Sequence, residues 1–384
     1  MLNKKKIAIV VNSRANYARI KSVLIEINKS KQFKLQLIVG ASALLNKFGN
    51  LENIIKKDKL SISAKIYSII EGENLTTMAK STGLGIIELS TIFQNLKPDI
   101  ALTIADRFET MATAIVASYT NILLVHTQGG EITGSIDESV RHAITKLSHI
   151  HFPSTKNAAQ NIIKMGENRK NVFLTGCPSI DIAKKISKKK NFKEFKEGIG
   201  ASINLREKYI IVMHHPVTTE FTSTEIQIRE VIKAISEINI QTIWFWPNID
   251  AGSDTISKML RVYREKNFLK KVRFCKNLPP EDFLILANYA SCLVGNSSIA
   301  IREGSYLGIP SVNIGNRQSG REHGKNILHC GHEKKKIISL INRQIKHGKY
   351  KKETIFGKGN SAKLIKKILT KVKISIQKKL FYEK

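Results

Sequence analysis

The sequence lacks any apolar run long enough to cross a membrane as a helix, which takes roughly 18 or more residues. The first apolar run, Ile7–Val11, is too short for the core of a secretory signal peptide. Asn12-Ser13-Arg14 follows it with no cleavage pattern. We therefore expect a cytoplasmic protein without a membrane partner, in which this run is a buried first strand.

Paired cysteines and clustered metal ligands are also missing. The four cysteines lie far apart with no CxxC pair, which predicts reduced, structural thiols. Two groups of histidines lie close in sequence, but neither has the spacing of a zinc site with its fourth ligand, so no metal is expected. The residues concerned are Cys177, Cys275, Cys292, Cys330, His142, His149, His151, His323, His329 and His332.

Two nucleotide-binding signatures are absent as well. The first predicted strand ends in Asn12–Tyr17 and carries no Gly-rich dinucleotide fingerprint, which argues against NAD or FAD. The chain also has no GxxxxGK[ST] sequence, which argues against phosphoryl transfer of the P-loop kind. No cofactor is predicted.

Negative charge is scarce: the formal net charge is +32. Arginine, the residue favoured for bidentate phosphate and base recognition, supplies only 14 of the 63 cations. The lysines are spread along the chain, and no aromatic residues are interleaved with them as stacking platforms. This pattern favours a solvated lysine-rich surface over a nucleic-acid partner, although a positive field attracts anionic substrates.

At 384 residues the chain exceeds what one core usually supports, so two domains are expected. Short β-type runs alternate with amphipathic segments of helical length, which is typical of α/β proteins with parallel sheets. Strands are predicted at 6–11, 34–39, 65–69, 99–104, 122–125, 149–152, 172–175, 209–213, 241–246, 272–274, 292–294 and 311–314. Helices are predicted near 16–29, 42–57, 76–96, 107–119, 137–147, 155–166, 224–238, 253–266, 280–289, 299–307 and 334–346.

This layout predicts two doubly wound, Rossmann-like domains facing each other across a cleft. The first would span residues 1–183 and the second 201–360, joined by a lysine-rich stretch at 184–200. The tail, 361–384, is predicted as a helix that packs back on the first domain. Its apolar face would be made by Ile365, Ile368, Leu369 and Val372.

Proton-handling and anion-handling side chains gather after two neighbouring predicted strands of the first domain. They are Asp106, Arg107, His126, Gln128, Glu131, Asp137, Arg141 and His142. The carboxyl ends of parallel strands form the ligand-binding edge of open α/β folds. Carboxylates, imidazoles and guanidiniums at that edge indicate acid/base chemistry on a negatively charged substrate, and therefore an enzyme.

The second domain offers a matching set of strand-end groups. Gly295–Glu303 closes a strand and opens a helix, where small hydroxyl residues can cradle a phosphate or simply cap the helix. Glu303 lies one turn further on and can hold a ribose diol or merely favour the helix dipole. The other strand-end groups of this half are His214, His215, Asn248 and Arg317.

In combination these motifs resemble those of the hydrolysing nucleotide-sugar 2-epimerases, especially the enzymes that serve sialic, legionaminic and related nonulosonic acid synthesis. The resemblance covers essentially the whole chain and implies a GT-B fold, with the nucleotide held by the C-terminal domain and the sugar facing the N-terminal one. It also implies a homodimer. The motifs that carry it are Ser13–Tyr17, Asp106–Glu109, Gly129–Lys146, Gly176–Pro178, His215–Thr219, Pro247–Gly252, Gly295–Glu303 and Gly315–Gly320.

The resemblance implies a two-step reaction on UDP-N-acetylglucosamine or a close relative. A base removes the C2 proton while the nucleoside diphosphate leaves C1, and water then adds to the resulting glycal with inversion at C2. The catalytic residues implied are Asp106, Asp137, Glu131 and His215. The substrate- and nucleotide-binding residues implied are Arg14, Arg107, Gln128, Arg141, His142, Asn248, Ser297, Ser298, Glu303 and Arg317.

Three positions depart from the family pattern. Gln128 stands where many members have a glutamate, and an amide cannot act as a general base, so that carboxylate role is vacant or passes to Glu131. Asn16 and Ala18 stand where an aspartate and a serine are often found. These changes suggest a modified sugar, such as a diacetylbacillosamine-type donor carried by UDP or GDP, as the alternative to UDP-N-acetylglucosamine.

Three other functions remain compatible with the sequence. A GT-B glycosyltransferase would use the same cleft to move the sugar to an acceptor, and a non-hydrolysing 2-epimerase would return the nucleotide to the sugar. The residue sequences of His126–Glu131 and Gly134–His142 favour the hydrolysing branch of the 2-epimerases. An RNA- or membrane-surface-binding protein would need only the +32 charge and would not require ordered strand-end carboxylates.

Overall fold

Two parallel sheets, one per half of the chain, build the molecule, as a computed structural model shows for residues 4–186, 195–372 and 375–381. The first sheet has the order β3-β2-β1-β4-β5-β6, and every pairing in it is parallel. Its strands are β1 (Lys5–Val11), β2 (Phe33–Gly40), β3 (Ile62–Ile66), β4 (Ile100–Ile104), β5 (Leu123–Thr127) and β6 (Ile150–Phe152). The helices of this half are α1 (Arg14–Asn28), α2 (Glu52–Lys57), α3 (Leu75–Leu96), α4 (Phe108–Tyr119), α5 (Asp137–Leu147), α6 (Lys156–Lys164) and α7 (Ser179–Ile186).

The second sheet has the order β13-β12-β11-β8-β9-β10-β7, with only the short edge strand β7 antiparallel. Its strands are β7 (Ile199–Gly200), β8 (Tyr209–Met213), β9 (Gln241–Phe245), β10 (Val272–Cys275), β11 (Cys292–Gly295), β12 (Ser311–Ile314) and β13 (Ile327–Cys330). The helices are α8 (Thr224–Ile238), α9 (Ser253–Glu265), α10 (Pro280–Tyr289), α11 (Ser298–Ile301), α12 (Glu303–Leu307), α13 (Lys334–His347) and α14 (Ser361–Lys371).

Helices cover both faces of the first sheet because successive side chains of a strand point to opposite faces. Ile7 and Ile9 of β1 pack in a buried cluster with α1 and α14, whereas Ala8 and Val10 pack with α3 and α4. The continuous apolar run that suggested a buried first strand is therefore explained by burial on both sides. No helix in the described part of the chain is long and apolar enough to span a membrane.

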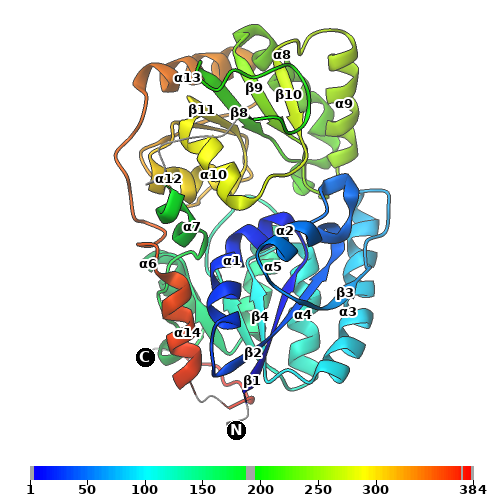
Figure 1. Ribbon diagram of the computed structural model, residues 1–384, viewed down its shortest axis with the longest axis vertical. Helices are drawn as coiled ribbons and strands as arrows, with labels where there is room; N and C mark the ends of the chain where they lie inside the picture. The colour runs from blue at the N-terminus through cyan, green and yellow to red at the C-terminus, as the bar shows by residue number, and fades with distance from the viewer. Residues whose placement is uncertain (1–3, 187–194, 373–374, 382–384) are drawn as a thin grey trace.

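The C-terminal helix returns to the first sheet, as predicted, but the predicted extent of 361–384 was wrong: the helix ends at Lys371, and residues 375–381 are not helical. In Figure 1, α14 lies beside α1 at the lower half of the molecule, after a long segment that descends from α13. Ala362, Ile365 and Leu369 are buried in the same cluster as β1 and β2. Asp181 of α7 accepts the backbone N–H groups of Ser361 and Ala362, and so caps the start of α14.

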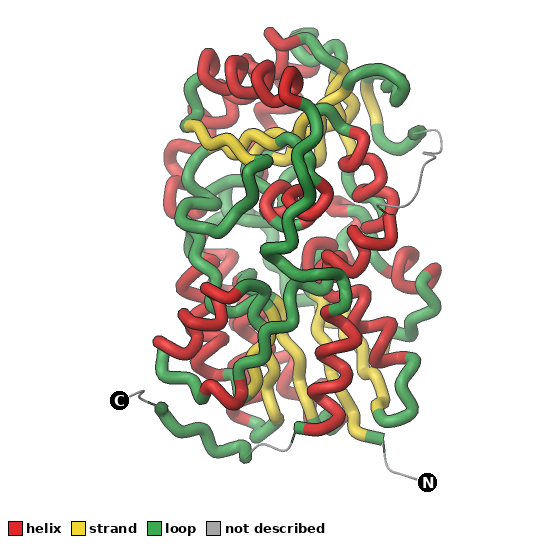
Figure 2. Tube along the Cα trace, turned by 90° about the vertical axis from the view of Figure 1, so that its left-hand side faces the viewer, coloured by secondary structure: helices red, strands yellow, loops and turns green. Residues whose placement is uncertain are grey.

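The two segments that connect the halves of the chain touch each other. The Cys177 amide donates to the Phe356 carbonyl over 2.7 Å, and a Cβ on Gly176 would lie 2.9 Å from the Gly357 Cα. Both glycines have a positive φ, 78° and 120°, which side chains disfavour. Figure 2 shows these connecting loops between the two lobes.

Several predicted elements were wrong. The helix predicted over 42–57 breaks into two 3₁₀ turns and the short α2, because Gly49 has φ 79° and interrupts the helical path. The strand predicted over 172–175 pairs only at Val172. The helix predicted over 299–307 is two helices with a kink at Arg302 (φ −87°, ψ −73°).

Other elements were missed: α7, β7 and β13 were not predicted. The lysine-rich stretch predicted as a connection, 184–200, begins in the last turn of α7 and ends in β7. Its central part, residues 187–194, lies outside the described residues.

Candidate active site

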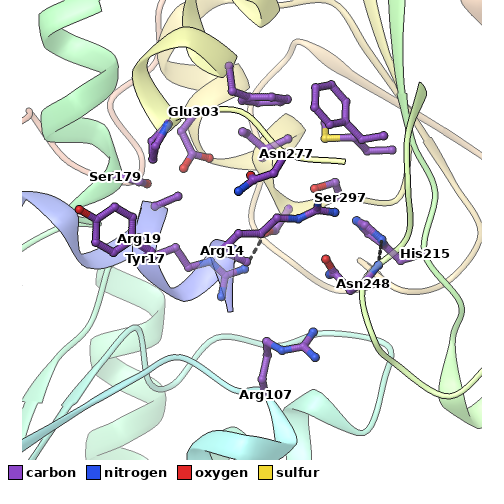
Figure 3. A pocket seen from close by; sticks show the side chains of 18 of the residues that line it. Arg14, Tyr17, Arg19, Arg107, Ser179, His215, Asn248, Asn277, Ser297 and Glu303 are labelled. Atoms are coloured by element: carbon purple, nitrogen blue, oxygen red, sulfur yellow. Dashed lines mark hydrogen bonds between the residues drawn. The ribbon is translucent and has the colours of Figure 1, made fainter. Parts of the chain in front are cut away.

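The carboxyl ends of both sheets face one cleft, which opens to solvent. Ten of the residues predicted for the site line it and so lie together in space. They are Arg14, Asp106, Arg107, Asp137, His215, Asn248, Ser297, Ser298, Glu303 and Arg317. Figure 3 shows Arg14 and Arg107 on one side of this space, with His215, Asn248 and Ser297 on the other.

Four predicted residues do not line the cleft: Gln128, Glu131, Arg141 and His142. Arg141 lies behind it and binds Asp106, with its Nε 3.2 Å from that carboxylate. His142 is a half-buried residue of α5, and its Nε2 is 3.4 Å from Glu138. Gln128 is fully buried with φ 64°, and among the described residues neither its side-chain oxygen nor its nitrogen finds a hydrogen-bond partner.

Other cleft residues were missed from the sequence. Arg19 lies on α1, as Arg14 does, and its guanidinium donates to the Ser298 hydroxyl over 2.7 Å. Asn277 follows the end of β10, so the strand-end rule that selected Asn248 could have found it. The remaining missed polar residues are Tyr17, Thr133, Ser179, Gln318 and Arg321, and the apolar wall includes Met213, Phe245, Leu278, Phe283 and Leu284.

Arginines concentrate positive charge in the cleft. Arg14 donates to the Trp246 carbonyl over 2.8 Å, and burial together with the nearby Arg107 lowers its pKa to about 10. Arg107 is 3.0 Å from Asp250, and Arg317 is 3.5 Å from Asp137. Guanidiniums held in this way can bind a diphosphate, because several fixed donors converge on one anion.

His215 is arranged as a neutral hydrogen-bond donor. Its Nδ1 accepts the Asn248 backbone N–H at 3.2 Å, which leaves the ring proton on Nε2. Burial, with Arg317 and Arg14 nearby, holds the pKa of His215 well below the ordinary histidine value. An uncharged imidazole N–H can stabilise a phosphate oxygen, while its predicted catalytic role stays a prediction.

The two aspartates of the cleft have opposite electrostatic environments. Burial acts against ionisation of Asp106, but Arg141 and Arg19 outweigh it and hold its pKa well below the ordinary value. Burial and the neighbouring Asp106 raise the pKa of Asp137. A pair of carboxylates whose pKa values are pushed apart can divide proton transfer between them.

Glu303 and the two serines line the second-domain side of the cleft. Ser297 precedes α11 and Ser298 begins it, which places both hydroxyls at the end of β11. Glu303 begins α12 and is buried, and this burial raises the pKa of its carboxyl. These residues form a polar rim opposite Arg14, as Figure 3 shows for Ser297 and Glu303.

Comparison with known proteins identifies the family. A family model described as UDP-N-acetylglucosamine 2-epimerase matches residues 25–370. The chain belongs to that family. It is 32% identical over 359 residues to the UDP-N-acetylglucosamine 2-epimerase of Neisseria meningitidis serogroup B, covering 93% of this chain and 92% of that protein.

A second relative of this epimerase family carries a more specific name. The UDP-N,N'-diacetylbacillosamine 2-epimerase (hydrolyzing) of Legionella pneumophila is 31% identical over 379 residues, covering 97% of each chain. Among solved structures, the Methanocaldococcus jannaschii UDP-GlcNAc 2-epimerase, in complex with UDP-GlcNAc and UDP, superposes with a TM-score of 0.76. That match, at 18% identity, covers 95% of this chain and 99% of the other, and it confirms the predicted two-domain fold.

Proposed function

We propose that this chain is a hydrolysing nucleotide-sugar 2-epimerase. The observation that carries the proposal is the placement of two carboxylates, Asp106 and Asp137, in a cleft that five arginines also line. The carboxylates can handle protons at the sugar, and the arginines can bind the departing diphosphate. Family membership and the name of the Legionella relative support the same reaction.

In the first step, Asp137 takes the C2 proton, the C–H electron pair forms the C1–C2 double bond, and the C1–O bond breaks. The nucleoside diphosphate leaves with the electron pair of the C1–O bond, and Arg14, Arg107 and Arg317 stabilise its negative charge. The neutral His215 adds a donor without repelling these cations. The raised pKa of Asp137 makes it the stronger base of the pair.

In the second step, water gives its hydroxyl to C1 and a proton to C2, on the face opposite the one from which the first proton left. Inversion therefore needs a proton-handling group on each face of the sugar. Gln128 cannot carry a proton, so we assign the second role to Asp106, which Arg141 and Arg19 hold as an anion. Asp106 takes a proton from the water that adds to C1 and passes it to C2, while Asp137 releases to solvent the proton that it took in the first step.

We propose that the nucleotide binds to the second domain, residues 201–360, and that the sugar faces the first, residues 1–183. Glu303 would accept the ribose hydroxyls, and Ser297 and Ser298 would contact the diphosphate. We also propose that the chain works as a homodimer in the cytoplasm, on the strength of the family resemblance. Size-exclusion chromatography with light scattering would test the assembly, and a monomer would contradict it.

The sugar is proposed to be an N-acetylglucosamine type or its 4-amino-modified relative of legionaminic acid synthesis. The name of the Legionella relative supports the modified sugar, and the name of the Neisseria relative supports N-acetylglucosamine. We expect the purified protein to release nucleoside diphosphate from at least one of UDP-N-acetylglucosamine and UDP- or GDP-diacetylbacillosamine, and NMR should show the free 2-epimerised sugar. If none of the three donors released nucleoside diphosphate, the proposed reaction would be contradicted. Release that requires an added acceptor would indicate a glycosyltransferase.

The pH profile gives an independent check. Asp137 must be deprotonated to take the C2 proton, so turnover should fall as pH drops through its pKa. Because burial and Asp106 raise that pKa, the acidic limb of kcat should lie above 3.8, the ordinary aspartate value. A pH series of nucleoside diphosphate release measures it. A limb at or below 3.8 would show that Asp137 is not the titrating base.

A further inference from the structure

Glu131 joins the two domains without facing the cleft. It follows β5, and its side chain is almost completely buried. One carboxylate oxygen accepts the Arg302 guanidinium at 2.7 Å and two groups of Arg321, at 2.5 and 3.0 Å. Both arginines belong to the second half of the chain, and of these three residues only Arg321 lines the cleft.

Arg321 is held on its other side as well. Its Nη1 donates to the Gln318 side-chain oxygen over 2.8 Å, and the Gln318 amide donates to the Asn296 carbonyl over 2.9 Å. Gln318, which also lines the cleft, is therefore fixed between Arg321 and the end of β11. Glu131 thus anchors a chain of contacts that ends in two cleft side chains.

The Glu131 backbone is linked through Arg141 to the carboxylate of Asp106. Its carbonyl accepts the Arg141 Nη1 at 2.5 Å, and Arg141 in turn binds Asp106. Three arginines and two carboxylates therefore form one buried cluster, with Arg302 and Arg321 supplied by the second half of the chain. Glu131 therefore supplies negative charge to two buried arginines of the other half of the chain.

We propose that Glu131 is a positioning residue that holds Arg321 and Gln318 at the wall of the cleft, and that it is not itself a proton carrier. This role deepens the proposed function and rests on it for its effect on turnover. Burial acts to raise the pKa of Glu131, but Arg302 and Arg321 outweigh it and lower that pKa to about 2. A carboxylate held in this way stays ionised near neutral pH and keeps its arginines in place.

The first test does not depend on turnover. Hydrogen–deuterium exchange of the loop 315–322 is compared between the native protein and Glu131→Gln. The Ser319 and Arg321 amides, which donate to Asn316 and Gln318 carbonyls, should exchange about tenfold faster in the variant, because local opening becomes less costly. Gly83→Ala, on α3 where an added Cβ meets nothing within 4 Å, serves as the control. Unchanged exchange in Glu131→Gln would overturn the anchoring role.

Glu131→Asp provides a second variant should Glu131→Gln not fold. It keeps the charge but shortens the side chain, so exchange of the same loop should rise less than in Glu131→Gln. Arg321→Met removes the other partner and should also speed exchange at Ser319. Native-like exchange in both variants would contradict the proposal.

A double-mutant cycle on turnover separates positioning from direct catalysis. Glu131→Gln should lower kcat by about 10- to 100-fold with little change in nucleoside diphosphate affinity. If Glu131 acts through Arg321, the double variant with Arg321→Met should be no slower than the slower single variant. Losses that multiply would show that Glu131 acts on the substrate directly. A native protein inactive on every donor would refute the proposed function, while the exchange measurement would still decide the anchoring role.

Discussion

Asp137→Asn is expected to lower turnover by at least about 10²-fold while nucleoside diphosphate still binds. Asparagine has nearly the shape of aspartate but cannot accept the C2 proton. Asp137 lies 3.5 Å from Arg317, so the substitution also removes a negative charge from the anion site. The dissociation constant for the nucleoside diphosphate should therefore stay the same or fall, although catalysis is lost.

Initial rates of nucleoside diphosphate release and calorimetric titration with the diphosphate measure the two effects. Asp254→Asn is a suitable control, because Asp254 is an exposed carboxylate paired with Lys47 at the surface, outside the cleft lining. Native turnover in Asp137→Asn would mean that its carboxylate has a structural role only. A parallel loss of turnover and binding would place it in nucleotide recognition.

Gly134→Ala should have an effect of similar size for a steric reason. A Cβ at this position would lie 2.0 Å from the Asn316 carbonyl oxygen, across the contact between the domains, where the Gly134 amide donates to the Arg317 carbonyl over 3.3 Å. The loops that carry Asp137 and Arg317 would have to move apart by more than about 1 Å to restore a normal contact distance. A misplacement of that size can cost about 10²-fold in rate.

We expect the fold of the first domain to be unaffected by Gly134→Ala. The three nearest atoms to the added methyl all belong to Asn316 and Ser319 of the second half, and Gly134 has no positive φ that alanine would strain. Thermal unfolding should stay close to native while kcat/KM falls. Gly83→Ala again serves as the control. Native kcat/KM in Gly134→Ala would show that catalysis does not require this contact.

Much of the site could be predicted because parallel strands deliver their following residues to one edge. Asp106 follows β4, His215 follows β8 and Ser297 follows β11, and each was found from an apolar run that ends in a polar group. The doubly wound sheets were predictable for the same reason, since runs such as Ile7–Val11 can be apolar throughout only when both faces are covered.

The rest depended on contacts between residues distant in sequence. Glu131 was predicted as a catalytic group, and no local pattern indicates that Arg302 and Arg321, about 170 and 190 residues away, occupy its carboxylate. Arg19 lies within α1 and not at the end of a strand, so a search for polar residues that follow strands does not find it. α7 was missed because the eight-residue helix follows Gly176-Cys177-Pro178, which had suggested the end of the series.

The contact between Gly176 and Gly357 restricts how the enzyme can open. The chain passes between the domains twice, and the two passages contact each other here and again where Lys184 donates to the Lys358 carbonyl over 3.1 Å. Because the two connections are held together, we expect the domains to rotate about this contact more easily than to slide past each other, which would break the Cys177–Phe356 hydrogen bond. In such a rotation the displacement of an atom grows with its distance from the Gly176–Gly357 contact. A small rotation would therefore widen the cleft most on the side farthest from that contact.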